Sequence, residues 1–218
     1  MAIRAILFDL DGTLIDQFQA IYKAFALTLE RMGYAKPSFE EVKSAVGGAS
    51  ESTMEKLIGP ERAKEAVQIL RPIFEQEMLN GLTLLPGAEE ILDWCNASKV
   101  KAAVLTNKYG PHARVVCKHL GLSKNLEFVI GADDTRWKKP NVKLTNYTLE
   151  KIGCNAQESL YIGDSPYDYK TAQNASMKFF LVSTGTHRVD ELLKLSASVE
   201  VKPDLESLIP LIEKLIFR

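Results

Sequence analysis

The chain has 218 residues, of which 46% are hydrophobic and 25% are charged, and its formal net charge is −1 at pH 7. This length can bury a substantial core, as one large domain or as a main domain with a smaller insert. The near-neutral charge creates no field that would attract nucleic acid or an anionic membrane, so we expect neither partner. No apolar run approaches the roughly 18 residues that a membrane-spanning helix needs.

The cysteines and the first residues indicate the compartment. Cys95, Cys117 and Cys154 are odd in number and far apart, which favours buried thiols over a disulfide framework or a metal site. Asp9 interrupts the first apolar stretch too early for a signal peptide. We therefore expect a cytoplasmic protein.

The first predicted element is a buried strand at residues 5–8, which is followed by two carboxylates two positions apart. Strand alternation would place Asp9 and Asp11 on the same side, and Gly12 lets the chain turn immediately afterwards. Two crowded carboxylates are electrostatically costly, and a divalent cation such as Mg²⁺ would relieve that cost. An ionised carboxylate can also attack phosphorus. The alternative is an Asp-Gly turn with two solvated acids.

Residues 16–80 show helical patterns and no strand pattern. The predicted helices span 17–32, 38–46, a short stretch from the Gly47–Gly48 turn to 59–60, and 61–79. Pro72 is expected to kink or split the last of them. We predict that 16–80 is an all-helical cap domain inserted into a core domain formed by 1–15 and 81–218.

After Pro86 and Gly87 the predicted helices and strands alternate strictly. The strands are 101–106, 127–130, 159–162, 178–182 and a short one near 199–201, and the helices are 88–97, 111–120, 143–152, 167–175, 188–194 and 204–217. This alternation predicts an α/β fold with a doubly wound parallel sheet. In such sheets the ligand binds beyond the carboxyl ends of the strands.

Polar residues follow the predicted central strands at their carboxyl ends. Thr106 and Asn107 follow one strand, Lys139 lies on the loop after the next, and Asp164 and Asp168 follow a third. Singly, each has an ordinary explanation as a strand end, a solvated lysine, an Asx turn or a first-turn helix acid. Together they predict a site with at least four carboxylates, a hydroxyl and a fixed cation.

These residues carry a resemblance to a known family. The segments DLDGTL (9–14), Thr106–Asn107, Lys139–Pro140 and GDSPYD (163–168) resemble, in this order, the four motifs of the haloacid dehalogenase superfamily. The helical insert resembles the cap of that superfamily. The segments 85–87, 106–108 and 163–165 are most similar to phosphoglycolate phosphatases and their close relatives.

The resemblance implies a phosphoryl-transfer mechanism. Asp9 would be the nucleophile that forms an aspartyl-phosphate, and Asp11 would protonate the leaving alkoxide and then activate a water. Thr106 and the amide of Asn107 would hold phosphoryl oxygens, and Lys139 would balance the charge of Asp9 and the phosphate. Lys139 directly precedes the proline, so we expect it, and not its neighbour at 138, to face the phosphate.

The resemblance also implies a Mg²⁺ site. The ion would bind the side chains of Asp9 and Asp164 and the backbone carbonyl of Asp11. Asp168 would act mainly by orienting a metal-bound water.

The substrate is the least determined part. The Gly47–Gly48 turn leads into a helix whose first amides could hold a small carboxylate, with help from Lys43, which would suit 2-phosphoglycolate. Other candidates are a nucleoside monophosphate, a small sugar phosphate or pyrophosphate. A phosphomutase is less favoured, because residues 20–22 and 47–49 offer no His or Arg for a second phosphate. A dehalogenase has no use for Asp11, and a non-enzymatic binding protein would not need all four motifs. The enzyme could be a monomer or a homodimer. His187 is interpreted as a loop residue with a surface role.

Overall fold

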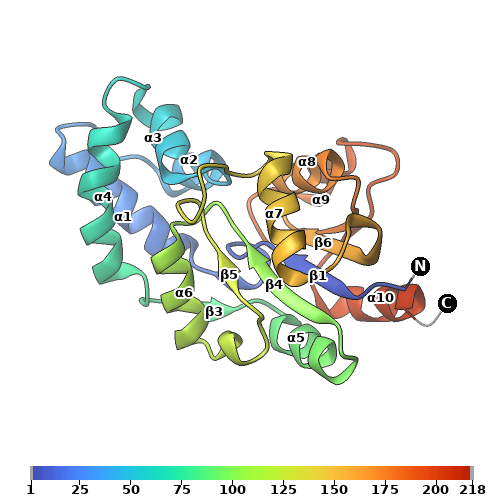
Figure 1. The fold of residues 1–218 in the computed structure, drawn as a ribbon. Coiled ribbons are helices and arrows are strands. Elements are labelled where there is room, and N and C mark those ends of the chain that lie inside the picture. The colour runs from blue at the N-terminus through green and yellow to red at the C-terminus, as the bar shows by residue number, and fades with distance from the viewer. Residues whose placement is uncertain (1, 217–218) are drawn as a thin grey trace.

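The computed structural model describes residues 2–216, and it consists of an α/β core with a helical insertion near the N-terminus (Figure 1). The core contains a six-stranded parallel sheet in the order β5-β4-β1-β6-β7-β8. Its strands are β1 (Ala5–Phe8), β4 (Lys101–Leu105), β5 (Val129–Ile130), β6 (Ser159–Gly163), β7 (Lys178–Val182) and β8 (Val201–Lys202). The predicted doubly wound parallel sheet is confirmed.

Helices cover both faces of this sheet. They are α5 (Ala88–Ala97), α6 (Gly110–His119), α7 (Val142–Ile152), α8 (Pro166–Asn174), α9 (Val189–Leu193) and α10 (Ile209–Ile216). Alternate residues of β1 point to opposite faces: Ile6 and Phe8 pack with α5, α6 and α10, whereas Ala5 and Leu7 pack with α7 and α8. The last helix was predicted from 204 to 217; it starts later, after a 3₁₀ turn at Glu206–Leu208, and residue 217 lies outside the described residues.

The insertion contains four helices, α1 (Phe18–Arg31), α2 (Phe39–Ala45), α3 (Ser50–Ile58) and α4 (Ala63–Glu77). Its local signals are conventional: Ser38 accepts a hydrogen bond from the amide of Glu41, and the Glu41 carboxylate accepts one from the amide of Ser38. Pro72 was expected to kink or split α4, and it does not split the helix, which continues through it. Leu70 and Phe74 on either side are buried, so packing offsets the missing backbone hydrogen bond.

A short antiparallel ribbon connects the insertion to the core. β2 (Ile15–Asp16) pairs with β3 (Thr83–Leu84) on either side of the four helices (Figure 1). Asp16 therefore belongs to a strand, although it was placed in a range predicted to hold only helices. Two residues are too few to show alternation, and their pairing depends on a segment far away in the sequence.

The cysteines and the helices agree with a plain globular interior. The three cysteines are free, and burial raises the pKa of the Cys95 and Cys117 thiols to about 12. Within residues 2–216, no helix combines the length and the apolar character that crossing a bilayer requires.

Candidate active site

A cavity of about 160 Å³ lies between the helical insertion and the carboxyl ends of the central strands. On the core side it is lined by Asp9 after β1, Thr106 after β4 and Asp164 after β6. On the other side it is lined by helices of the insertion, for example by Phe25 and Phe74. This is the crevice where a doubly wound sheet binds its ligand, because β1 is flanked by strands reached in opposite directions.

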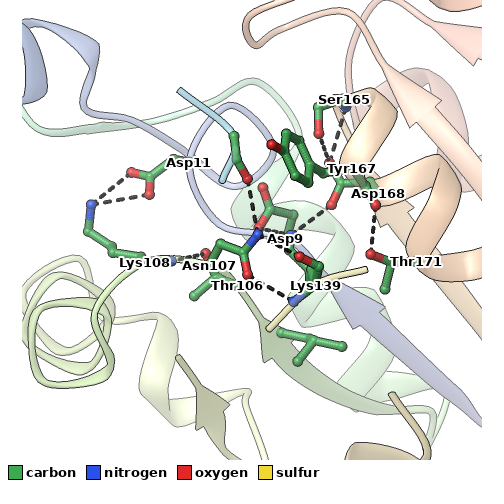
Figure 2. Close-up of polar contacts among 12 residues, drawn as sticks. Asp9, Asp11, Thr106, Asn107, Lys108, Lys139, Ser165, Tyr167, Asp168 and Thr171 are labelled. Carbon is green, nitrogen blue, oxygen red and sulfur yellow. Dashed lines mark hydrogen bonds and ion pairs between the residues drawn. The ribbon is translucent and has the colours of Figure 1, made fainter. Parts of the chain in front are cut away.

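Three buried carboxylates and one lysine converge at the core side of the cavity. Asp9, Asp164 and Asp168 each offer an oxygen within 4.8 Å of the others. The Lys139 ammonium lies 2.6 Å from Asp9 Oδ1 and 2.8 Å from Asp168 Oδ1, and its side chain is only 2% exposed. Figure 2 shows Lys139 between these two acids. The neighbouring Lys138 is exposed, so Lys139 is the lysine that reaches the acids.

Asp9 and Asp164 are held in an environment that disfavours their charge. Burial raises the pKa of Asp9 to about 6, although Lys139 opposes the increase. Burial, together with the charges of Asp168 and Asp9, also raises the pKa of Asp164 well above its usual value. Burial alone would lower the pKa of Lys139, but Asp168 and Asp9 outweigh it and raise the pKa. One ammonium thus does not neutralise the cluster.

The residues fit a divalent cation. Among the described residues, Asp9 Oδ2 and Asp164 Oδ1 accept no hydrogen bond, whereas their partner oxygens do. Both residues line the cavity, so these two oxygens are open to a ligand, and a hard dication prefers carboxylate oxygens. Asp9 and Asp164 therefore have the donor atoms that a Mg²⁺ ion requires.

Asp168 differs from the other two acids because both of its oxygens are occupied. Oδ1 accepts from Lys139 and from the Tyr161 hydroxyl at 3.0 Å. Oδ2 accepts from the amides of Asp164 and Ser165 at 3.2 and 3.1 Å, and from the Ser165 hydroxyl. Asp168 thus fixes the turn that carries Asp164 and orients Lys139.

Two glycines permit the close approach of Asp164 to the neighbouring loops. Gly12 has a φ of +86°, and a Cβ there would lie 2.8 Å from Asp164 Oδ2. A Cβ on Gly185 would lie 1.7 Å from the same oxygen. Only glycine fits at these two positions, so the loops can pack directly against the acid cluster.

Asp11 lies in the same cavity but outside the acid cluster. Both of its carboxylate oxygens are 3.1 Å from the Lys108 ammonium (Figure 2). The Lys108 ammonium also lies 4.7 Å from the centre of the Phe74 ring on α4. Lys108 was not among the predicted site residues. The available signal was its position, directly after Thr106 and Asn107 at the carboxyl end of β4.

Thr106 and Asn107 both line the cavity, and their side chains have different partners. Thr106 Oγ1 accepts from the amide of Lys108 at 3.1 Å. The Asn107 side chain donates to the carbonyls of Gly47 and Lys139, both at 3.2 Å, and accepts from the Lys139 amide at 2.9 Å. Asn107 thus connects the loop before α3 to the loop that carries Lys139.

The insertion contributes residues that were predicted and one that was missed. Gly47 and Gly48 line the cavity directly before α3. Lys43 does not line it, because its ammonium lies over the Phe18 ring at 5.2 Å from the centre. Arg71 on α4 does line the cavity. Nothing in the helical pattern distinguishes Arg71 from a solvated arginine until α4 packs beside α6.

His187 lies next to the cavity but does not line it. Its Nδ1 is 2.8 Å from the hydroxyl of Thr186, which is itself a lining residue. Burial lowers the pKa of His187.

Comparison with known proteins identifies the family. Residues 6–182 match the model of the haloacid dehalogenase-like hydrolases. The chain belongs to the haloacid dehalogenase-like hydrolase family. A phosphoglycolate phosphatase of Rhodobacter capsulatus is 31% identical over 187 residues, which cover 83% of this chain and 84% of the relative. A phosphoglycolate phosphatase of Pectobacterium atrosepticum is 30% identical over 218 residues, which cover 97% of this chain and 93% of the relative.

Solved structures share the fold of this hydrolase. A haloacid dehalogenase-like family protein of Streptococcus pneumoniae superimposes with a TM-score of 0.84 at 23% identity, and the match covers 96% of this chain and 98% of that protein.

A sequence relative from Dickeya dadantii is named a probable phosphatase. It is 27% identical, and the match covers 86% of this chain and 84% of the relative. The names of the relatives thus agree on hydrolysis more than on one substrate.

Proposed function

We propose that this hydrolase is a Mg²⁺-dependent phosphatase that cleaves a small phosphate monoester through an aspartyl-phosphate on Asp9. The observation that carries the proposal is the shared position of Asp9 and Asp164 beside the buried Lys139. Phosphoryl transfer needs in-line positioning and charge neutralisation more than any other contribution. A carboxylate that faces a cavity between a cation and a potential metal ligand meets both requirements.

The proposed reaction uses two acids in different roles. A carboxylate oxygen of Asp9 attacks phosphorus while the bond to the leaving alkoxide breaks, and Asp11 gives its proton to that alkoxide. Asp11 then takes a proton from the water that hydrolyses the aspartyl-phosphate. Asp11 suits this part because it lies in the same cavity and outside the cluster that would hold the metal.

The remaining predicted residues would position the phosphoryl group. Mg²⁺ would be held by the side chains of Asp9 and Asp164 and the carbonyl of Asp11, and when bound it would neutralise phosphoryl charge. Lys139 would balance the charge of Asp9. The hydroxyl of Thr106 and the backbone amide of Asn107 would hold phosphoryl oxygens, since the side-chain amide of Asn107 is already engaged. Asp168 is proposed to act by positioning, since its oxygens are already occupied.

The proposed substrate is 2-phosphoglycolate. Two relatives at about 30% identity bear the name of its phosphatase, and a cavity of about 160 Å³ suits a small ester. Gly47 and Gly48 are proposed to present the first amides of α3 to the leaving group. We take 16–80 as the cap domain and 1–15 with 81–218 as the core domain. The substrate would then be enclosed between these two domains.

Pyrophosphate, nucleoside monophosphates and sugar phosphates are the alternatives. One relative, from Caldanaerobacter subterraneus and 31% identical over 82% of this chain, carries the name of a pyrophosphatase. Arg71 provides a cap cation that residues 20–22 and 47–49 do not, so a phosphomutase stays an alternative as well.

The test is hydrolysis of p-nitrophenyl phosphate and a panel of phosphate esters, with and without Mg²⁺. We expect Mg²⁺-dependent turnover that Asp9→Asn abolishes, while Asp93→Asn, an exposed acid on α5, retains it. No turnover of any ester by the native chain would refute a phosphatase. A panel in which 2-phosphoglycolate is not preferred would refute the substrate, and transfer to a sugar phosphate would favour the mutase.

A further inference from the structure

The side of the cavity formed by the cap is mainly apolar, and its two charges are Arg71 and Glu51. Ile21, Val67 and Phe74 are among the apolar side chains there. Glu51 lies in the first turn of α3, where the helix N-terminus offsets a negative charge. Arg71 lies in the interior of α4, away from either helix end. No helix terminus therefore offsets its positive charge.

The Arg71 guanidinium is held without an acidic partner. Its central carbon lies 4.2 Å from the centre of the Tyr109 ring, directly before α6. Among residues 2–216, no carboxylate forms an ion pair with Arg71. When a guanidinium stacks on the face of an aromatic ring, its N–H donors point outward in the plane of the guanidinium itself. They stay free to bind a planar anion such as a carboxylate.

Two of the other cations at the cavity are already paired with acids of the site. Lys139 pairs with Asp9 and Asp168, and Lys108 pairs with Asp11. Lys138 and Arg71 are both exposed, but Arg71 lies on the cap and against the Tyr109 ring, whereas Lys138 lies on the core loop that carries Lys139. Among the described residues that line the cavity, Arg71 is therefore the cap cation that a second negative charge on the substrate can use without competing with an acid of the site.

The position of Arg71 places this charge at the leaving-group end. Phe74, one turn further along α4, contacts Lys108, which in turn holds Asp11. Asp11 is the residue proposed to protonate the leaving alkoxide. A group beside Arg71 would thus belong to the alcohol part of the ester, on the cap side of the cavity.

We propose that Arg71 is a specificity residue that binds a second anionic group, a carboxylate in the first instance, on the leaving group of the phosphate ester. This inference rests on the proposed phosphatase activity and narrows its substrate class. Neutral and cationic esters of the same size are expected to be poorer substrates. Glu51, on the same wall, would oppose the anion, so Arg71 is needed to make the cap side attractive.

The test compares three esters of similar size and different charge: 2-phosphoglycolate, 2-hydroxyethyl phosphate and O-phosphoethanolamine. The native enzyme should prefer them in this order by kcat/KM. Arg71→Glu should lower the ratio of kcat/KM for 2-phosphoglycolate to kcat/KM for O-phosphoethanolamine by about 10- to 100-fold. This is the range expected for a lost charge-assisted hydrogen bond. Arg71→Lys should retain only part of the preference, because the positive charge remains but the planar fork of donors is lost.

The matched control is Arg31→Glu, which makes the same charge change in the last turn of α1, where Arg31 is exposed and does not line the cavity. It should leave the three ratios unchanged. A purely structural role of Arg71 would lower all three rates together and leave their ratio constant, and that result would overturn the inference. If the native chain hydrolyses neither p-nitrophenyl phosphate nor any of the three esters, the proposed phosphatase activity itself fails; turnover of p-nitrophenyl phosphate with none of the three would overturn this inference alone. If Arg71→Glu does not fold, the ratio measured with Arg71→Gln decides in the same way.

Discussion

Removing the charge of Asp9 should change the way in which stability depends on pH. The pKa of Asp9 is raised from its usual 3.8 to about 6, mainly by burial. A difference of one in pKa corresponds to ~1.4 kcal/mol, so the ionised carboxylate weakens the fold by about 3 kcal/mol. A carboxyl whose pKa is raised on folding contributes stability below its unfolded pKa, and this contribution disappears as the pH rises through the folded pKa.

The expected outcome is a difference between two titrations. In EDTA, the native chain should lose about 2 kcal/mol more than Asp9→Asn in its free energy of unfolding between pH 4 and pH 6.5, which is the part of the linkage that falls in this range. Saturating Mg²⁺ should reverse this loss in the native chain, because a cation relieves the same charge, by about 2.7 kcal/mol at 100 times the dissociation constant. Asp9→Asn should gain much less.

The assay is urea denaturation followed by the fluorescence of Trp94 and Trp137, at pH 4 to 7.5, with EDTA or Mg²⁺. Asp93→Asn serves as the matched control and should follow the native chain. Parallel curves for the native chain and Asp9→Asn in EDTA would refute the conclusion that burial opposes the charge of Asp9. Equal stabilisation of both by Mg²⁺ would refute the assignment of Asp9 as a ligand.

Three further predictions test single contacts. Lys139→Met should lower kcat for p-nitrophenyl phosphate about 10²- to 10³-fold, as for other lost electrostatic contacts. The control Lys138→Met should lower kcat less than about fivefold. Similar losses in the two variants would mean that the ammonium beside Asp9 is not required. Gly12→Ala should weaken the Mg²⁺-dependent increase in melting temperature, because its Cβ would lie 2.8 Å from Asp164; an unchanged increase would contradict this. Burial lowers the pKa of His112, so in urea titrations the native chain should become less stable relative to His112→Gln as the pH falls below about 6.5; a constant difference between the two would exclude a contribution from this histidine.

Local pattern was sufficient for the fold class and for the positions of most helices. The four apolar residues of β1 are buried on both faces because helices cover both sides of a parallel sheet, and this burial is what the sequence shows. The β2–β3 ribbon could not be found in this way, because two-residue strands have no period. The sequence also left open whether Pro72 kinks or splits its helix, and the packing of Leu70 and Phe74 decides against a split.

By itself, the sequence determined which side chains follow the central strands, because the residue after each strand is a matter of order along the chain. Asp9, Thr106, Lys139 and Asp164 are predictable for this reason. Only the tertiary structure decided how they divide: Lys139 reaches Asp9 and Asp168, whereas Lys108 holds Asp11.

The positions of the charges on the helical insertion were also decided by tertiary structure alone. Lys43 and Arg71 both lie on helices of the insertion with nothing in sequence to distinguish them. The packing of α4 beside α6 brings Arg71 to the cavity, and the rings of Phe18 and Phe39 hold Lys43 away from it. The direction of an exposed side chain depends on the neighbouring element, which no periodicity along its own helix records.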